Sequence, residues 1–191
     1  MILEILKYGH PVLRKKGARV EKVTPEIKRL IADMFETMAE RHGVGLAAQQ
    51  VGHALQLTVI DVRLATERPS TLQLAGVASD PNAFMPLVLL NPEIKPLSDP
   101  VSGAEGCLSF PEIYSEIARP ESVEVTATND RGEQLHFRCG GLLARAIQHE
   151  TDHLHGILFI DRMETDKRRE FKAELDELQA ETKGALRKTG K

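Results

Sequence analysis

The chain contains no tryptophan, and aromatic residues make up only 4% of its 191 residues. Aliphatic side chains must therefore supply most of the apolar surface of the core. Only two cysteines are present, Cys107 and Cys139, and these are too few for a disulfide framework. The cysteine content favours a reducing compartment, so we expect a cytoplasmic protein.

Long apolar runs and a strong excess of one charge are also missing. No segment approaches the length of a membrane-spanning helix, and residues 1–7 lack the basic and apolar regions of a secretion signal. A net charge of −3 gives no general attraction to nucleic acid or to an anionic membrane. We therefore expect neither a direct nucleic-acid site nor a membrane role, and we predict one domain over residues 1–191.

Hydrophobic periodicity predicts a mixture of helices and strands. Thr24, Pro25 and Glu26 form a strong helix start, and the apolar residues that follow recur at helical spacing until Gly43. A short helical piece is expected to end near Lys16. The predicted strands cover residues 2–6, 55–61, 85–91, 112–118, 121–128 and 133–138, with a short strand or extension at 158–160.

Two further segments have weaker patterns. Residues 65–86 lose periodicity and gather Ser, Pro, Asp, Ala and Gly, so we interpret them as a surface excursion and not as a second domain. Residues 165–186 predict a charged helix, and we favour its packing against the domain over a role in binding a partner. Its apolar residues on one side are Phe171, Leu175, Leu178 and Ala185.

The most informative pattern is H-E-x-x-H at residues 149–153. His149 and His153 are four residues apart, so on a helix both imidazoles project from one face and can bind the same metal ion. Glu150 lies beside that face, where its carboxylate can reach a water on the metal without binding the metal. The pattern predicts a metal-activated hydrolase, and a solvated helix face or a structural metal clip is the alternative.

A hydrolytic metal site generally has three protein ligands and one open position. Cys107 is the preferred third ligand, because a thiolate binds divalent metals well and the preceding glycine permits close backbone approach. Cys139 is the competitor, and a lone cysteine is otherwise most often a small buried hydrophobic residue. Downstream carboxylates of the right type lie in the charged helix, namely Glu164, Glu170 and Glu174.

Residues 43–50 read Gly-Val-Gly-Leu-Ala-Ala-Gln-Gln. No strand–loop–helix dinucleotide pattern surrounds them and no P-loop lysine follows, so a phosphate-binding role is disfavoured. Beside a metal site the segment has a clearer use. Its small residues permit close backbone approach, and a glutamine amide can donate to a developing oxyanion.

Together and in this order, residues 43–50, 105–109 and 148–153 resemble the peptide deformylase family. That family carries G-φ-G-φ-A-A-x-Q, E-G-C-φ-S and Q-H-E-x-D-H, where φ is apolar, and this chain matches all three. The resemblance spans most of the chain and is weakest at residues 65–86. It implies an α+β fold, with antiparallel strands around a central helix that carries H-E-x-x-H, followed by a C-terminal helix.

The resemblance also implies an activity, which is removal of the formyl group from the N-terminal formylmethionine of new polypeptides, with release of formate. One divalent ion per chain is implied, Fe²⁺ in vivo, with Zn²⁺ or Ni²⁺ able to substitute. Glu150 would be the general acid–base, and the Gln50 side chain and Leu108 backbone N–H would stabilise the oxyanion. The implied metal ligands are Cys107, His149 and His153.

The implied partner is an N-formylmethionyl nascent peptide, with a transient ribosome association, and the peptide would pair with the enzyme as an added strand. The residues implied to bind it are Val44, Gly45, Gly106, Leu142 and Ala146. For Leu142 and Ala146 an ordinary helix core is an equally good interpretation. Glu105 would orient a ligand or form a plain salt bridge, and Arg119 would shape the mouth of the site or be a surface charge.

Two other functions stay open at this point. A zinc endopeptidase would use the same H-E-x-x-H motif with a downstream carboxylate, and it would keep its metal after loss of Cys107. A non-catalytic metal-binding or ribosome-associated module would tolerate loss of Glu150.

Overall fold

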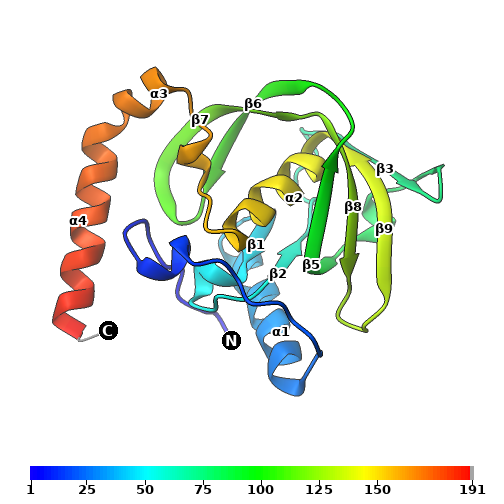
Figure 1. The fold of residues 1–191 in the computed structure, drawn as a ribbon, viewed down its shortest axis with the longest axis horizontal. Helices are drawn as coiled ribbons and strands as arrows, with labels where there is room; N and C mark the ends of the chain where they lie inside the picture. The colour runs from blue at the N-terminus through cyan, green and yellow to red at the C-terminus, as the bar shows by residue number, and fades with distance from the viewer. Residues whose placement is uncertain (190–191) are drawn as a thin grey trace.

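The computed structural model describes residues 1–189, and its strands surround one central helix, α2 (Gly141–Leu154) (Figure 1). Nearly all of α2 is buried, and it contacts strands of both sheets. The helix begins at Gly141, whose φ of +65° favours glycine. A Cβ there would lie 2.2 Å from the carbonyl oxygen of Pro69, so this tight start requires glycine.

The larger sheet has seven antiparallel strands in the order β1-β2-β5-β8-β9-β3-β4. The smaller sheet is a hairpin of two long strands, β6 and β7, whose register shifts between Gly106 and Cys107. The strands are β1 Gly45–Ala47, β2 Leu57–Ile60, β3 Ser70–Leu74, β4 Val77–Ser79, β5 Leu87–Pro96, β6 Pro100–Cys107, β7 Phe110–Pro120, β8 Ser122–Thr128 and β9 Gln134–Gly140.

Three other helices accompany α2, and four single-turn 3₁₀ helices link the elements of the described chain. Helix α1 begins with Thr24, whose hydroxyl accepts a hydrogen bond from the Ile27 backbone at 3.4 Å. The helices are α1 Pro25–Glu40, α3 Thr165–Glu170 and α4 Lys172–Thr189, and the 3₁₀ turns are Pro11–Arg14, Ala48–Val51, Asn82–Phe84 and Phe159–Asp161.

Aliphatic side chains fill most of the core, as the composition predicts. One cluster lies between α2 and the large sheet and includes Leu89, Val125 and Ile147. A second cluster packs α1 against β1 and β2, and a third lies under β7 and the C-terminal segment. Within residues 1–189, no helix is both long and apolar enough to cross a membrane.

The predicted helix after Thr24, the α2 helix and the strands near 55–61, 85–91, 112–118, 121–128 and 133–138 are confirmed. The short helical piece before Lys16 is the 3₁₀ turn Pro11–Arg14. The predicted C-terminal helix is interrupted at Phe171 and so becomes α3 and α4. Its apolar side packs against the core through Phe171, Leu175 and Leu178, whereas Ala185 is exposed.

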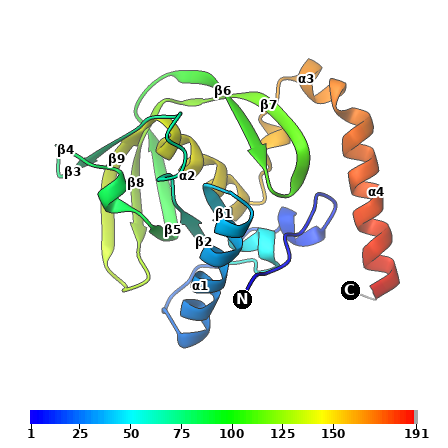
Figure 2. The ribbon, with the colours of Figure 1, turned by 180° about the vertical axis from the view of Figure 1, so that it is seen from behind.

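Three predicted elements are wrong. Residues 2–6 are irregular, because their hydrogen bonds run to helical segments and not to a neighbouring strand. Leu3 donates to the Thr37 hydroxyl in α1 at 2.8 Å, and Leu6 donates to the Gln50 carbonyl in a 3₁₀ turn at 2.8 Å. Residues 158–160 do not form a strand and instead enter a 3₁₀ turn. Residues 65–86 are more than a surface excursion, because β3 and β4 form a hairpin that pairs with β9 and extends the sheet (Figure 2).

Candidate metal centre and substrate cavity

Cys107, His149 and His153 come together although the cysteine and the histidines are far apart in sequence. Cys107 ends β6 at the register shift, and the two histidines lie on one face of α2. Their ligand atoms all lie within 4.8 Å of one another, and the Cys107 Sγ is 3.4 Å from His153 Nε2. One sulfur and two imidazole nitrogens suit a divalent transition metal, so the residues present fit such an ion.

Glu105 sets the orientation of His149. Its Oε2 lies 2.9 Å from His149 Nδ1, which leaves Nε2 of that ring for a metal. Arg119 donates to both Glu105 oxygens, at 2.6 and 3.1 Å. Burial raises the pKa of Glu105, but the hydrogen bonds from His149 and Arg119 outweigh it and lower that pKa to about 2. Glu105 is therefore held as a carboxylate.

Arg119 was expected at the mouth of the site or on the surface, and the structure places it inside. It is only 3% exposed, and it joins Glu105 to Asp152 by a 2.8 Å hydrogen bond from its Nη1. Asp152 also accepts from Arg162 at 2.7 Å. Asp152, one of the two x positions of H-E-x-x-H, thus anchors α2 to β7.

Arg145 is a buried residue that the sequence did not single out for the site. It donates to Glu105 at 3.0 Å and to the Ile117 carbonyl at 2.8 Å, so it ties α2 to both strands of the β6–β7 hairpin. A Cβ at Gly103 would lie 2.7 Å from the Arg145 guanidinium. The absence of a side chain at Gly103 therefore leaves the space that the Arg145 guanidinium occupies. The sequence offers no other sign of the role of Arg145 than this glycine.

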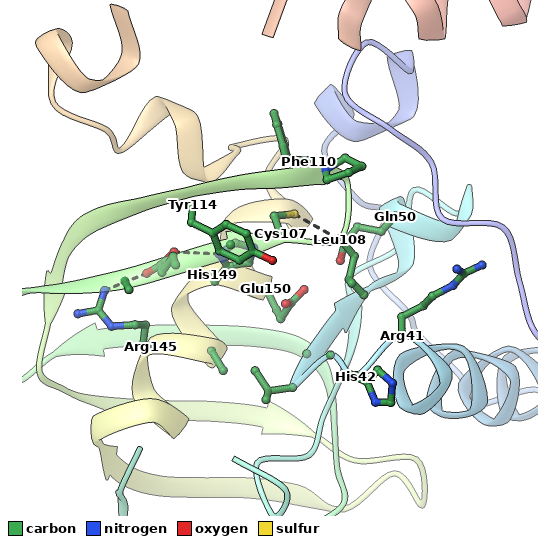
Figure 3. A pocket seen from close by; sticks show the side chains of 18 of the residues that line it. Arg41, His42, Gln50, Cys107, Leu108, Phe110, Tyr114, Arg145, His149 and Glu150 are labelled. Carbon is green, nitrogen blue, oxygen red and sulfur yellow. Dashed lines mark hydrogen bonds and ion pairs between the residues drawn. The ribbon is translucent and has the colours of Figure 1, made fainter. Parts of the chain in front are cut away.

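The Gln50 amide points toward Cys107. Its Oε1 accepts from the Ala47 backbone N–H at 2.9 Å, and its Nε2 therefore faces Cys107 Sγ at 3.5 Å and Ser109 Oγ at 3.4 Å. Lys7 donates to the Leu108 carbonyl at 2.8 Å, which holds the backbone beside Cys107. Gln50 and Leu108 thus lie next to the ligand group (Figure 3).

Glu150 lines the cavity close to β1 (Figure 3). A Cβ at Gly45 would be 2.6 Å from its Oε1, so the glycine permits this approach. Its Oε2 is buried and has no hydrogen-bond partner among residues 1–189. Burial raises the pKa of Glu150 to about 7, while His149 opposes that rise.

A cavity of about 560 Å³ opens beside these groups. Ten of the eleven predicted site residues line it, namely Val44, Gly45, Gln50, Gly106, Cys107, Leu108, Leu142, Ala146, His149 and Glu150. The eleventh, His153, lies in the ligand group behind it. Leu142 and Ala146 line the cavity and also belong to the core cluster. The interpretation as substrate-pocket residues and the interpretation as helix core are therefore compatible.

The competing ligands are not brought to this group. Cys139 is packed in the core on β9, where burial raises the pKa of its thiol to about 12. The acidic candidates of the charged helix are absent from the group formed by the described residues, namely Glu164, Glu170 and Glu174.

An S/N₂ donor set beside a buried carboxylate and an amide donor, within an α+β fold, defines the class of metal-dependent hydrolases. Residues 2–169 match the family model described as polypeptide deformylase. Peptide deformylase of Opitutus terrae is 42% identical over 189 residues, which is 98% of each chain. Peptide deformylase of Methylacidiphilum infernorum is 43% identical, over 93% of each chain.

Solved structures agree with the fold. The crystal structure of peptide deformylase from Thermus thermophilus matches with a TM-score of 0.79 at 38% identity, covering 95% of this chain and 99% of that one. This chain belongs to the polypeptide deformylase family. It is a hydrolase of a metal-dependent family, and it removes the N-formyl group from the N-terminal methionine of nascent polypeptides.

Proposed function

We propose that residues 1–191 form one catalytic domain whose Cys107, His149 and His153 hold a single divalent ion. The observation that carries this proposal is the group of three ligand atoms within 4.8 Å, next to a carboxylate without a hydrogen-bond partner among the described residues. The ion is Fe²⁺ in vivo, with Zn²⁺ or Ni²⁺ able to substitute, since a thiolate and two imidazoles suit all three. When bound, it supplies Lewis-acid chemistry by lowering the pKa of water and polarising the formyl carbonyl.

Glu150 moves the proton in the reaction. It takes the proton from the attacking water and passes it to the departing amine, so one carboxylate acts first as base and then as acid. Its burial and its unpartnered Oε2 support this role, because no arginine or lysine holds that oxygen in another contact among the described residues.

Gln50 and Leu108 stabilise the oxyanion that forms when water adds to the formyl carbon. The Gln50 amide is fixed by its bond to Ala47, so Nε2 is already a donor on the Cys107 side of the cavity. The Leu108 backbone N–H is the second donor, on a segment that Lys7 holds. Loss of one such donor typically lowers the rate by about 10²–10³-fold.

The peptide substrate lies as an extended strand between β1 and β6. Val44 and Gly45 line one side of the cavity and Gly106 the other, so backbone groups on both sides are available for pairing. Leu142 and Ala146 on α2 contribute the apolar wall that receives the methionine side chain. A formyl group is the smallest acyl group, and an acetyl methyl would have to displace a ligand or Gln50.

The enzyme meets its substrates in the cytoplasm, with a transient association with ribosomes as nascent chains emerge. Two unpaired cysteines, one of them a proposed metal ligand, support a reducing compartment. A thiolate on Fe²⁺ is also prone to oxidation, so the iron form is expected to lose activity in air.

The test is formate release from formyl-Met-Ala-Ser by anaerobically purified protein, with the metal content measured in parallel. We expect turnover at about one metal per chain, loss of turnover with retained metal in Glu150→Gln, and loss of metal in Cys107→Ala. Cys139→Ala is the matched cysteine control, and it should keep both the turnover and the metal. Metal retention in Cys107→Ala would instead indicate a zinc site completed by another ligand, and full activity of Glu150→Gln would exclude the proposed proton transfer.

A further inference from the structure

Two arginines of the cavity lining have no acidic partner. Arg41 and Arg68 are both exposed, and neither forms an ion pair with any residue among 1–189. Arg145, by contrast, lines the same cavity but is paired with Glu105. Lys7 adds a further cation to the lining, and Glu112 is its one exposed acidic residue. The outer part of the cavity is therefore cationic in a chain whose net charge is −3.

Arg68 is held at a defined place by its neighbours. It lies just before β3, in the segment interpreted from sequence as a surface excursion. The next residue, Pro69, accepts a hydrogen bond from the Leu142 backbone at 3.0 Å, and the Ser70 hydroxyl accepts from the Leu143 backbone at 3.0 Å. The start of α2 thus anchors the segment, and the exposed Arg68 side chain extends over the cavity lining.

The Arg68 side chain reaches β6. Its Nη1 donates to the Ala104 carbonyl at 3.1 Å. Ala104 lies two residues before Gly106, on the strand along which the substrate is proposed to pair. A guanidinium carries five N–H donors, so one bond to a carbonyl leaves donors for a carboxylate.

The position of Arg68 relative to a bound peptide follows from strand geometry and rests on the proposed function. With the formyl group at Cys107 and the methionine beside Gly106, an extended peptide advances about 3.3 Å per residue. The third residue of the peptide then lies opposite Ala104, where the Arg68 side chain is bound.

We propose that Arg68 is a specificity-determining residue that favours formylmethionyl peptides with an acidic side chain at their third residue. The carboxylate of that residue pairs with the Arg68 guanidinium. Glu116 is an exposed acid opposite Ala104 on β7, and its Oε2 accepts a hydrogen bond from the Ser102 hydroxyl at 2.9 Å. A basic third residue is repelled by the Arg68 guanidinium, and its peptide is processed more slowly.

The test compares three peptides with amidated C-termini, so that no terminal carboxylate contributes: formyl-Met-Ala-Glu, formyl-Met-Ala-Gln and formyl-Met-Ala-Lys. For the metal-loaded enzyme we expect kcat/KM to fall in that order, by about three- to tenfold from Glu to Lys at low salt. The ratio should shrink as salt is added, because both charges are exposed.

Charge reversal at Arg68 is the decisive variant. Arg68→Glu should invert the order of kcat/KM for the Glu and Lys peptides. Arg68→Lys should keep the order with a smaller ratio, because lysine retains the charge and loses the fork of donors. The matched control is Arg29→Glu, which changes the net charge equally at an exposed site on α1 outside the cavity lining.

The outcomes separate this inference from the proposed function. An unchanged Glu-to-Lys ratio in Arg68→Glu, or an equal change in Arg29→Glu, would overturn the role of Arg68 while turnover of the Gln peptide still supports the deformylase mechanism. Peptides that carry the charge at their second residue test the placement. If Arg68→Glu changes their kcat/KM more than it changes the kcat/KM of peptides charged at the third residue, Arg68 does not lie opposite the third residue. Absence of turnover with every peptide would overturn both.

Discussion

At the buried end of the cavity each charged side chain of the network Glu105, Arg119 and Asp152 has a partner of opposite sign, whereas at the rim Arg41 and Arg68 have none among residues 1–189. The buried charges are paired because an isolated ion in the interior costs several kcal/mol or more. The rim charges are hydrated and need no partner. One set of charges is therefore committed to holding the metal ligands, and the other is available to an incoming peptide.

The largest effect is expected from replacing Glu150, the buried carboxylate whose Oε2 has no hydrogen-bond partner among residues 1–189. Glu150→Gln should lower kcat by about 10²–10⁴-fold, because the amide cannot move the proton, while the metal content and fold are kept. Steady-state formate release and metal analysis check it. The matched control is Glu164→Gln, an exposed residue outside the cavity, which should leave kcat unchanged. Comparable losses in the two variants would contradict the assignment.

Breaking the buried network should come next in size. Arg119→Ala removes one cationic partner from each of the buried carboxylates Glu105 and Asp152. We expect the free energy of unfolding to fall by about 3–5 kcal/mol. Metal affinity should fall by about 10–100-fold, because His149 loses a firmly held Glu105. Urea unfolding and chelator competition measure the two effects. Arg138→Ala, which removes an exposed pair with Glu124, should change neither measurably.

A smaller effect is expected where α2 meets the β6–β7 hairpin. Gly103→Ala should lower unfolding free energy by about 1–3 kcal/mol, because the added methyl overlaps the Arg145 guanidinium. In an Arg145→Ala background the same change should cost almost nothing. A double-mutant cycle by urea unfolding measures this coupling, and additive effects would show that the two sites are independent.

The smallest change is expected at Cys139. Burial raises the pKa of its thiol to about 12, so at pH 8 almost no thiolate is present and the native protein should not react there with a thiol reagent. After removal of metal, titration should label one cysteine per folded chain and two in urea. Peptide mapping should assign the first label to Cys107, and labelling of Cys139 in the folded chain would contradict its packing in the core.

Much of the ligand group was predictable because it depends on local geometry. His149 and His153 are four residues apart on one helix, so their common face follows from the helical repeat alone. Helix α1 was predictable for a similar reason, since Thr24 and Pro25 act on the first turn that they precede. Residue type alone leaves both cysteines open, and the structure brings Cys107 to the histidines.

Elements that depend on distant partners were missed. The β3 strand contains a short alternating segment among turn residues, and it becomes a strand because β9 provides the pairing. Residues 2–6 show the reverse case, since an apolar run that favours a strand finds no strand beside it. The buried role of Arg119 was hidden because β7 supplies the arginine and α2 supplies the aspartate.

By itself, the sequence determined the helix that carries the H-E-x-x-H motif, the apolar faces that bury it, and the residue types suited to a divalent metal. Only the tertiary structure decided which cysteine meets the histidines, how Glu105 is held by two arginines, and which cations face the open cavity. The physical reason is range. Helical spacing acts over a few residues, whereas the pairing of a buried charge depends on side chains that only folding brings within hydrogen-bond distance.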